Sequence, residues 1–491
     1  MTKELILGLD IGTSSVRAAL YDMRGDLIPK TLVKNERTLT ATHDGGAEID
    51  AGTALIQILA SVSDVLSIYQ DEAAEIAYLA TSSFWHSLVG VDTNGNPTTK
   101  VFGWADTRSR KYTERLEARF DESAIHDRTG ARFHSSFWPA KLLWLRTEFP
   151  DVFARTARWL SFSDFVALNL FGEAATSVSM ASGTGLLDLR TCSWDDKLLK
   201  FLKLRPEQLP TLPEDKQTFR LSKKFAKRWP RLKSAECFPA IADGAANNIG
   251  AGCVTRSKAA LMIGTSGAMR VAYRGEPPAK IPPGLWCYRI DRKRVIMGGA
   301  LSDGGGLYRW MKDNLRLGKD DDVEREIAKR EPAAHGLSVM PFFAGERSTG
   351  YHENAVGSIL GLRSSSDTID IVQAALESIA YRFADIFDQL NGLTRIKNII
   401  ASGGALRESP VWTQMIADVL GRDLTLPDTR EASMRGAVLL ALETTGRINK
   451  IEDVPTPSGK KFSADKSRKA VYSAARKRHR ETYKLLIDRE T

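Results

Sequence analysis

Cysteine is scarce in this 491-residue chain: there are four, and no two of them form a CxxC pair. This spacing argues against a zinc site and against a disulfide framework, because both need closely placed cysteines. Long apolar runs are lacking too. No stretch reaches the roughly 18 to 20 apolar residues of a membrane helix, and Asp10 interrupts the short N-terminal run before it could serve as a signal peptide. We therefore expect a cytoplasmic protein with no membrane association.

Two common nucleotide-binding signatures are also missing. The chain contains no GxxxxGK followed by Ser or Thr, and no HRDxxxxN. These absences exclude a P-loop as a phosphate cradle and a protein kinase as the class of enzyme. The length instead predicts two or three globular domains, so any phosphate site must be built in another way.

The positive charge is concentrated at the C-terminus. Of a net charge of +9, residues 460–491 contribute +7, with eleven Lys and Arg against four Asp and Glu. Such a tail could bind nucleic acid. However, Tyr472, Ala475, His479, Tyr483, Leu486 and Ile487 recur at helical spacing. A terminal helix docked by this stripe, with a solvated basic face, is the favoured interpretation.

Two stretches far apart in the chain share the tetrapeptide Ile-Gly-Thr-Ser, at residues 11–14 and 263–266. Alternating apolar residues predict a strand on each side of both copies, at residues 4–10, 16–21, 259–263 and 268–273. A chance repeat is the alternative, but the shared flanks favour a duplicated α/β domain. We expect the domains to span residues 1–245 and 246–491.

Periodicity places further elements between these strands. It predicts strands at residues 27–33, 75–81, 87–91, 294–299 and 396–402, and helices at residues 54–69, 108–119, 140–148, 161–170, 367–390, 411–420 and 437–442.

A Gly-Thr-Ser turn between two strands presents backbone N–H groups and hydroxyls at one point, which makes an anion site. Two such turns across a cleft would hold a polyphosphate from both sides. Mg²⁺ must then neutralise charge, and it prefers carboxylate and water oxygens. The first turn has Asp10 before it and the second has Met262, so one carboxylate would serve the metal. For either turn alone, an ordinary hairpin is the better interpretation.

Asp243 ends an apolar stretch and precedes three small residues. It could cap the helix that follows, or its carboxylate could act as a general base towards a hydroxyl in a cleft. The segment alone favours the cap.

Other candidates are weaker singly. Gly404 and Ala405 follow a predicted strand and would let the backbone approach a flat ligand, although a plain turn is as good an interpretation. Trp85 and His86 could contact a polyol, and Arg108 closes a Trp-Ala-Asp-Thr-Arg segment that could bind substrate or hold an internal ion pair.

Taken together, these segments resemble the FGGY carbohydrate kinases over nearly the whole chain. Five motifs occur in the family's order: LGLDIGTSSVRAAL and LMIGTSGAM as phosphate loops, IADGAANNIGAG around the catalytic Asp, PFFAGERSTGYHENAVGSILGL, and SGGALRESPVWTQMIADVLGRDL at the adenine site. The resemblance implies an α/β fold of two actin-like (ribonuclease H-like) domains with a nucleotide cleft between them. It also implies ATP as co-substrate and Mg²⁺ as the metal.

The resemblance further implies a role for each matching residue. Asp243 would be the catalytic base, and Asp10 and Asp243 would face Mg²⁺. Trp85, His86 and Arg108 would lie at the sugar. The nucleotide would contact Thr13, Ser14, Ser15, Arg17, Thr265, Gly305, Gly404, Ala405 and Glu408.

Two departures from the family pattern affect these expectations. Glu408 stands where glycerol kinases have an adenine-contacting Asn, and the GER motif continues with STGY, through Gly350, where the family usually has Ala or Ser and then Pro. SSFWHSLVG replaces the Arg-Glu pair that glycerol kinases use on glycerol, which argues against that substrate.

The segments SSFWHSLVGVD and GWADTRS look most like the gluconokinase branch. This likeness implies transfer of the ATP γ-phosphate to a terminal hydroxyl of D-gluconate, giving 6-phosphogluconate. An aldonate needs a cation for its carboxylate. Arg108, Arg132 and Lys141 are candidates, assisted by His86, although each could equally be a structural ion pair.

Two alternatives stay open. A pentulose such as xylulose or ribulose is the runner-up substrate. A nucleotide switch of the actin or Hsp70 type would share the fold, because fold does not fix function. We expect a small sugar or sugar acid and MgATP as partners, with no nucleic acid and no membrane, and the family is compatible with a homodimer.

Overall fold

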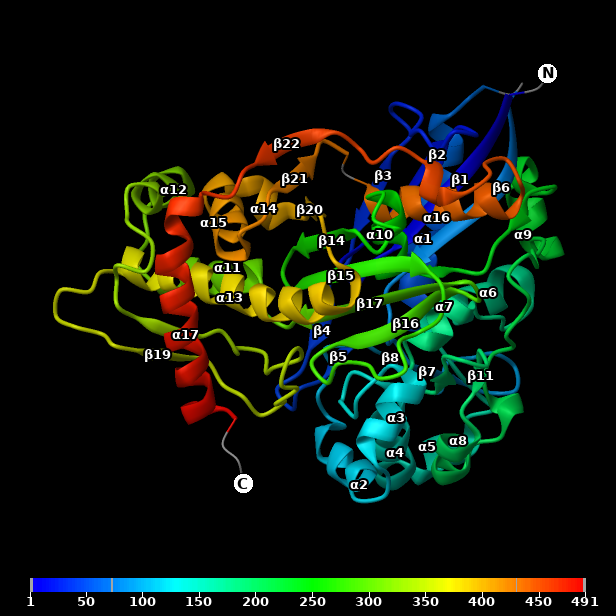
Figure 1. Cartoon of the computed structure of the whole chain (residues 1–491). Helices are drawn as coiled ribbons and strands as arrows, with labels where there is room; N and C mark the ends of the chain where they lie inside the picture. Colours follow the sequence, from blue (N-terminus) through cyan, green and yellow to red (C-terminus); the bar gives the residue numbers. More distant parts are fainter. Residues whose placement is uncertain (1–2, 72–73, 430, 489–491) are drawn as a thin grey trace.

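The computed structural model describes residues 3–71, 74–429 and 431–488 and arranges them in two α/β halves side by side (Figure 1). A six-stranded sheet organises the N-terminal half, and a seven-stranded sheet organises the C-terminal half. Helices cover both sheets, and the C-terminal helix lies at the outer side of the second half.

The first sheet has the strand order β12-β6-β1-β2-β3, with β13 also on β6. Its central strand β1 pairs antiparallel with β2, where Ile11 lies opposite Val16, and parallel with β6. The strands are β1 (Lys3–Ile11), β2 (Ser15–Tyr21), β3 (Val33–Glu36), β6 (Ala74–Ser83), β12 (Glu236–Cys237) and β13 (Ile241–Ala242).

The strand expected at residues 27–33 is wrong, since β3 begins only at Val33. Within the expected range, Leu27 forms a single bridge to Tyr21. Pro29 lacks the N–H that a ladder requires, and Lys30 has a left-handed φ of 64°. These two residues turn the chain before a strand can form.

The second sheet has the order β16-β17-β15-β14-β20-β21-β22. Its strand β14 pairs antiparallel with β15 and parallel with β20, as β1 does with β2 and β6. The repeated strand–turn–strand unit is thus confirmed. The strands are β14 (Lys258–Ile263), β15 (Gly267–Arg274), β16 (Trp286–Asp291), β17 (Arg294–Leu301), β20 (Asn398–Ser402), β21 (Leu424–Pro427) and β22 (Gly459–Phe462).

Helix α1 (Ala51–Ile68) covers the first sheet, as periodicity predicts. By length and composition it could cross a membrane, with a mean hydropathy of 1.6. Its Ile58, Val62 and Val65, however, are buried in the core formed with β1 and β2. An amphipathic helix packed on a sheet explains the composition.

The two halves are joined where α10 (Asp243–Gly250) crosses α16 (Ala432–Thr444). The crossing is very close: a Cβ on Gly250 would lie 1.9 Å from the Ala432 carbonyl oxygen, and one on Gly436 would lie 1.8 Å from that of Ala246. Helix α16 also packs on β1 and β6 of the other half. The division after residue 245 falls inside α10 and stays a prediction.

Helices and short strands fill the middle of the chain. The helix expected at residues 108–119 is shorter: a 3-10 turn (Arg110–Tyr112) leads into α2 (Thr113–Glu117). The helices predicted at residues 140–148 and 161–170 are confirmed as α4 (Trp138–Glu148) and α6 (Phe162–Phe171). The other elements here are β4 (Thr40–Ala41), β5 (Ala47–Ile49), β7 (Val89–Val91), β8 (Val101–Phe102), α3 (Glu122–Thr129), α5 (Pro150–Arg155), β9 (Arg158–Leu160), α7 (Val178–Ser182), β10 (Leu187–Asp188), β11 (Ser193–Trp194), α8 (Asp196–Leu202) and α9 (Lys223–Arg228).

A long central helix, α13 (Thr368–Thr394), carries the core of the second half and begins with a capping box of Asp367 and Asp370. The C-terminal helix α17 (Lys469–Leu486) packs on it through Tyr472, Ala475 and His479, so the predicted docked stripe is confirmed. The remaining elements are α11 (Gly305–Asn314), α12 (Asp320–Ala328), β18 (Ser338–Met340), β19 (Ser358–Leu360), α14 (Gly404–Glu408) and α15 (Pro410–Leu420).

Candidate active site

Each Gly-Thr-Ser turn is closed by a backbone hydrogen bond from its glycine, and the first turn is one residue longer than the second. The N–H of Gly12 donates to the carbonyl of Ser15 at 2.9 Å, and the N–H of Gly264 donates to that of Ser266 at 2.9 Å. Ser14 and Thr265 stand exposed at the tips of the turns, whereas Ser15 is buried and Thr13 is half-buried. Each turn therefore offers hydroxyls and N–H groups to a ligand in solution.

Two glycine-rich segments converge on the second turn. The N–H groups of Gly305 and Gly306 donate to the carbonyls of Gly264 and Thr265 at 2.8 and 2.9 Å. A Cβ built on Gly305 would lie 3.0 Å from the Cβ of Ala405. The structure thus brings the predicted nucleotide residues Thr265, Gly305 and Ala405 together at the start of α11.

Gly403 and the residues after it complete this surface. Gly403 has a φ of +101°, and a Cβ there would lie 2.1 Å from the Ile263 carbonyl oxygen, so only glycine fits. Gly404 is exposed at the start of α14, and Glu408 is exposed at the end of that same short helix. Gly404 and Glu408, both predicted to contact the nucleotide, are therefore accessible to solvent on the surface that Gly305 and Ala405 also form.

Asp10 lies near the end of β1 and is buried. Ser82 donates to its Oδ1 at 2.8 Å, and an Nη of Arg17 lies 3.6 Å from its Oδ2. Burial raises the pKa of Asp10 to about 6, against the opposing effects of Ser82 and Arg17, and the nearby charge of Asp243 raises it further. The negative charge of Asp243 therefore disfavours ionisation of Asp10.

Asp243 is the first residue of α10, and Ala242 is its cap, so the capping interpretation is wrong. Its Oδ1 accepts the N–H of Gly244 at 2.7 Å. Burial raises the pKa of Asp243 above the ordinary range, and the guanidinium of Arg270 opposes the increase. A desolvated carboxylate with a raised pKa is a more effective proton acceptor near neutral pH.

Asp243 lines a pocket of about 90 Å³ between the two halves. This volume has room for roughly six to nine water-sized groups, the scale of a small polyol and too small for a nucleotide. The pocket is lined by Phe84, Trp85, His86, Trp104, Asp243, Met262, Ser266, Gly267, Ala268, Arg270, Trp286, Tyr288, Ala300 and Arg347. A larger cavity of about 450 Å³, near Phe238 and Arg294, contains none of the predicted site residues.

Aromatic rings form the wall of the pocket. Trp85 donates its indole N–H to the Ser179 carbonyl at 3.0 Å and packs against Tyr288 at 5.0 Å between ring centroids. Trp286 stacks on Tyr288 at 4.5 Å. Trp85 comes from the first half and the other two rings from β16, so a sugar in this pocket would contact both halves.

His86 is held in an unusual conformation beside Trp85. Its backbone φ is 66°, which is uncommon for a residue other than glycine. Its Nδ1 lies 2.5 Å from the Gly183 carbonyl oxygen. Burial keeps the pKa of His86 well below its ordinary value, so the ring is neutral at physiological pH and would contact a sugar by hydrogen bonds rather than by charge.

Two arginines of the pocket were missed by the sequence reasoning. Arg270 is buried, and its Nε and Nη1 have no hydrogen-bond partner among the described residues. Arg347 lies over the Trp104 ring at 5.3 Å, and no carboxylate of the described chain lies within ion-pair distance of it. The signal was present, because Arg270 follows the second turn and Arg347 belongs to the quoted GER motif.

The cations that the sequence nominated are engaged elsewhere. Arg108 is paired with Asp106 at 2.5 Å and with Glu48 at 2.9 Å, outside the pocket lining. Arg132 is paired with Glu122. Lys141 is buried, donates to the Ser136 carbonyl at 2.5 Å, and has its pKa lowered to about 7 by desolvation.

A magnesium ion fits the charge distribution at this point. The charge of Asp243 raises the pKa of the buried Asp10, a repulsion that a divalent cation would relieve. No cluster of three His, Cys, Asp or Glu side chains suited to a metal occurs within residues 3–71, 74–429 and 431–488. Mg²⁺ would therefore be held as it usually is in kinases, by one or two carboxylates and the phosphates.

The pocket places the carboxylate of Asp243 beside Ser266 and Gly267 of the second turn, an arrangement that suits phosphate transfer to a small molecule. The comparisons with known proteins agree. The chain matches the FGGY family of carbohydrate kinases, with its N-terminal domain at residues 5–231 and its C-terminal domain at residues 259–444. This protein belongs to the FGGY family of carbohydrate kinases, which transfer phosphate to an alcohol group of a sugar with ATP as co-substrate.

Individual relatives agree on the fold but differ in substrate. A gluconokinase of Bacillus licheniformis is 28% identical over 91% of this chain and 89% of its own. A crystal structure of gluconate kinase from Lactobacillus acidophilus superposes with a TM-score of 0.90 at 25% identity, covering 99% of this chain and 98% of that one. A ligand-bound xylulose kinase from the same organism gives 0.91 at 25% identity, covering 98% of both. The predicted two-domain actin-like α/β fold is confirmed.

Proposed function

We propose that this kinase phosphorylates a terminal hydroxyl of a sugar acid, with D-gluconate as substrate and 6-phosphogluconate as product. The observation that carries the proposal is that one pocket contains the half-buried carboxylate of Asp243, the buried Arg270 and the half-buried Arg347, and that neither arginine forms an ion pair within the described residues. A buried guanidinium without a counter-ion is costly. An anionic substrate would remove that cost, whereas a neutral sugar would not.

In the proposed reaction, Asp243 accepts the proton of the terminal hydroxyl as that oxygen attacks the γ-phosphorus and ADP leaves. Little covalent help is needed, since positioning and electrostatic stabilisation dominate phosphoryl transfer. The turns at Thr13–Ser15 and Thr265 would bind the phosphates. Asp10 and Asp243 would hold Mg²⁺, which neutralises charge on the polyphosphate.

The adenosine end would lie along the rim formed by Gly305, Gly404, Ala405 and Glu408. This rim is accessible, and Gly404 and Glu408 are exposed on it. Arg17, paired at 3.4 Å with Glu431 as well as lying near Asp10, would shift towards the phosphates when they bind. Closure of the two halves would exclude water and so limit ATP hydrolysis.

A pentulose is the second candidate, because the xylulose kinase superposes as well as the gluconate kinase does. The unpaired arginines favour the acid over the neutral ketose. Cytoplasmic location follows from the need for ATP. It also suits the four cysteines, which are free and buried.

The test is ADP release by purified protein with MgATP and one acceptor at a time: gluconate, xylulose, ribulose, glycerol or erythritol. We expect a large stimulation by gluconate and little by the neutral polyols. Stimulation by a ketopentose instead would support kinase activity but refute a sugar acid as the substrate. ADP release that ignores every acceptor would indicate a nucleotide switch of the actin or Hsp70 type.

A further inference from the structure

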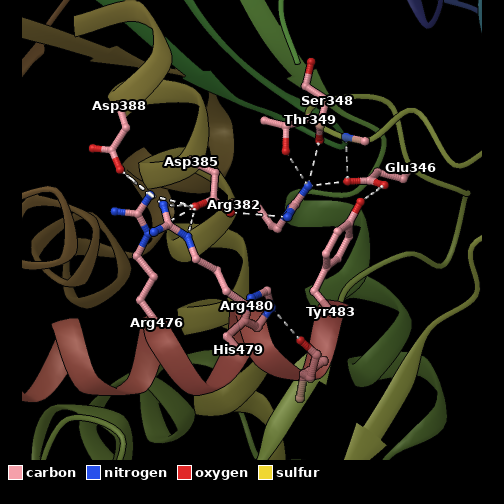
Figure 2. A network of polar contacts seen from close by, with 12 residues as sticks. Glu346, Ser348, Thr349, Arg382, Asp385, Asp388, Arg476, His479, Arg480 and Tyr483 are labelled. Carbon is pink, nitrogen blue, oxygen red and sulfur yellow. Dashed lines mark hydrogen bonds and ion pairs between the residues drawn. The ribbon is translucent and has the colours of Figure 1, made fainter. Parts of the chain in front are cut away.

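The C-terminal helix α17 reaches the turn that carries Arg347 (Figure 2). Its arginines Arg476 and Arg480 form ion pairs with Asp385 and Asp388 on α13, which fix the helix across that element. One turn further on, Tyr483 extends towards Glu346. The basic face of the tail is therefore partly occupied by internal ion pairs.

Glu346 is the point at which the helix meets the turn. Its side chain is 1% exposed. Three donors hold its carboxylate: the Tyr483 hydroxyl to Oε2 at 2.7 Å, the Gly350 N–H to Oε1 at 3.1 Å, and a guanidinium nitrogen of Arg382 to Oε1. A buried carboxylate that is fully satisfied in this way fixes the backbone on both sides of it.

Besides Glu346, Arg382 also contacts two other residues of the same turn, Ser348 and Thr349. It donates to the Thr349 Oγ1 at 3.1 Å and to the Ser348 carbonyl at 3.4 Å. On the other side, Ser348 exchanges hydrogen bonds with Ala300 of β17, at 2.9 Å from its N–H and 3.0 Å to its Oγ. The turn is thus held between β17, α13 and α17.

At Gly350 the helix α17 lies very close to the turn. A Cβ on Gly350 would lie 2.0 Å from the Tyr483 hydroxyl oxygen and 2.6 Å from Glu346 Oε2. The STGY segment, which departs from the family pattern, therefore has a glycine where the tyrosine of the terminal helix contacts the turn. The sequence of the turn and that of the helix are matched to each other.

Arg347 follows Glu346 directly, and its side chain lies in the pocket instead of against α17. It lies over Trp104, and burial lowers the pKa of its guanidinium while Asp243 opposes the change. Nothing charged on the described chain orients it within ion-pair distance. Its position consequently depends on the backbone that Glu346, Arg382 and Tyr483 hold.

We propose that Arg347 binds the carboxylate of the acidic substrate, and that Glu346 and Tyr483 are positioning residues through which the C-terminal helix sets this arginine. The proposal rests on the function proposed above. It gives the terminal helix a part in substrate selection, because a displaced guanidinium would weaken recognition of the acid and leave neutral contacts in the pocket unchanged.

The test compares Tyr483→Phe with a matched control, Tyr472→Phe. Both remove one hydroxyl from α17, but no hydrogen bond joins the Tyr472 hydroxyl to the turn. Loss of a hydrogen bond to a charged group is expected to raise the KM for gluconate roughly three- to ten-fold in Tyr483→Phe. The kcat and the KM for ATP should stay close to those of Tyr472→Phe, while the melting temperature should be lower because the buried Glu346 loses a donor.

A double-mutant cycle separates positioning from general loosening. If Tyr483 acts through Arg347, Tyr483→Phe should have no further effect on the gluconate KM in an Arg347→Met background. An equal effect in both backgrounds, or an unchanged gluconate KM in Tyr483→Phe or in Arg347→Met, would overturn the inference. Failure of the wild-type protein to phosphorylate gluconate would instead overturn the proposed function.

Discussion

Replacing Asp10 by Asn should make this protein more stable while it loses activity. Burial raises the pKa of Asp10 from an ordinary 3.8 to about 6, even though Ser82 and Arg17 favour the ionised form. Because the folded pKa lies above the unfolded one, ionisation costs stability as the pH rises from about 4 to about 6. The full cost, about 3 kcal/mol, persists at every higher pH.

Asparagine has nearly the same shape and can still accept the hydrogen bond from Ser82, but it carries no charge. Thermal melts at pH 8 should therefore place Asp10→Asn roughly 4–12 °C above the wild type, for a gain of about 2–3 kcal/mol in one half of the chain. The gain should shrink at pH 5, where the wild-type carboxyl is largely protonated. MgATP should raise the melting temperature of the wild type more than that of the variant. A variant that melts at or below the wild type at pH 8 would refute the reasoning.

Three further predictions concern the site and its frame. Since burial raises the pKa of Asp243, kcat/KM should fall with decreasing pH at a higher pH than an ordinary carboxyl near 3.9 would give. A fall at the pH of an ordinary carboxyl, or below it, would contradict this. Arg108→Met leaves the buried Asp106 without its cation, so thermal melts should show a free energy of unfolding lower by about 2–4 kcal/mol. The gluconate KM should stay within two-fold of the wild-type value if Arg108 does not contact the sugar. Gly403→Ala should lower the free energy of unfolding by about 1–3 kcal/mol, because the φ of Gly403 is +101° and a Cβ there would clash with Ile263. Calorimetry should also find weaker ADP binding. Unchanged ADP binding would show that this turn does not contact the nucleotide.

The framework of the fold could be predicted because its signals are local. The repeated turns at Gly12 and Gly264 lie between alternating strands, and both were found where periodicity placed them. The strand expected at residues 27–33 failed for an equally local reason, since Pro29 and Lys30 interrupt it. The contact between Gly250 and Gly436 could not be predicted, because it joins helices almost 190 residues apart and only their packing reveals it.

The site was harder to predict where long side chains are involved. Trp85, His86 and Asp243, which the sequence nominated, do line the pocket, and their roles there stay predictions. Arg108 was nominated and Arg347 was not, although both are arginines near aromatic rings. What distinguishes them is the partner: Asp106 and Glu48 neutralise the first, and no carboxylate of the described chain lies within ion-pair distance of the second. Pairing of this kind is a property of the packed structure and not of the sequence spacing.

The central claim is that Asp243 takes the proton of a terminal hydroxyl of gluconate during transfer from MgATP. The most direct measurement follows the product by ³¹P NMR, with wild-type protein and with Asp243→Asn, under conditions in which the wild type completes the reaction. The account predicts a 6-phosphogluconate monoester signal from the wild type. It predicts a rate lower by roughly 10²–10⁴ in the variant, which should still bind ATP. Wild-type turnover by Asp243→Asn, or a phosphate on another hydroxyl, would contradict it.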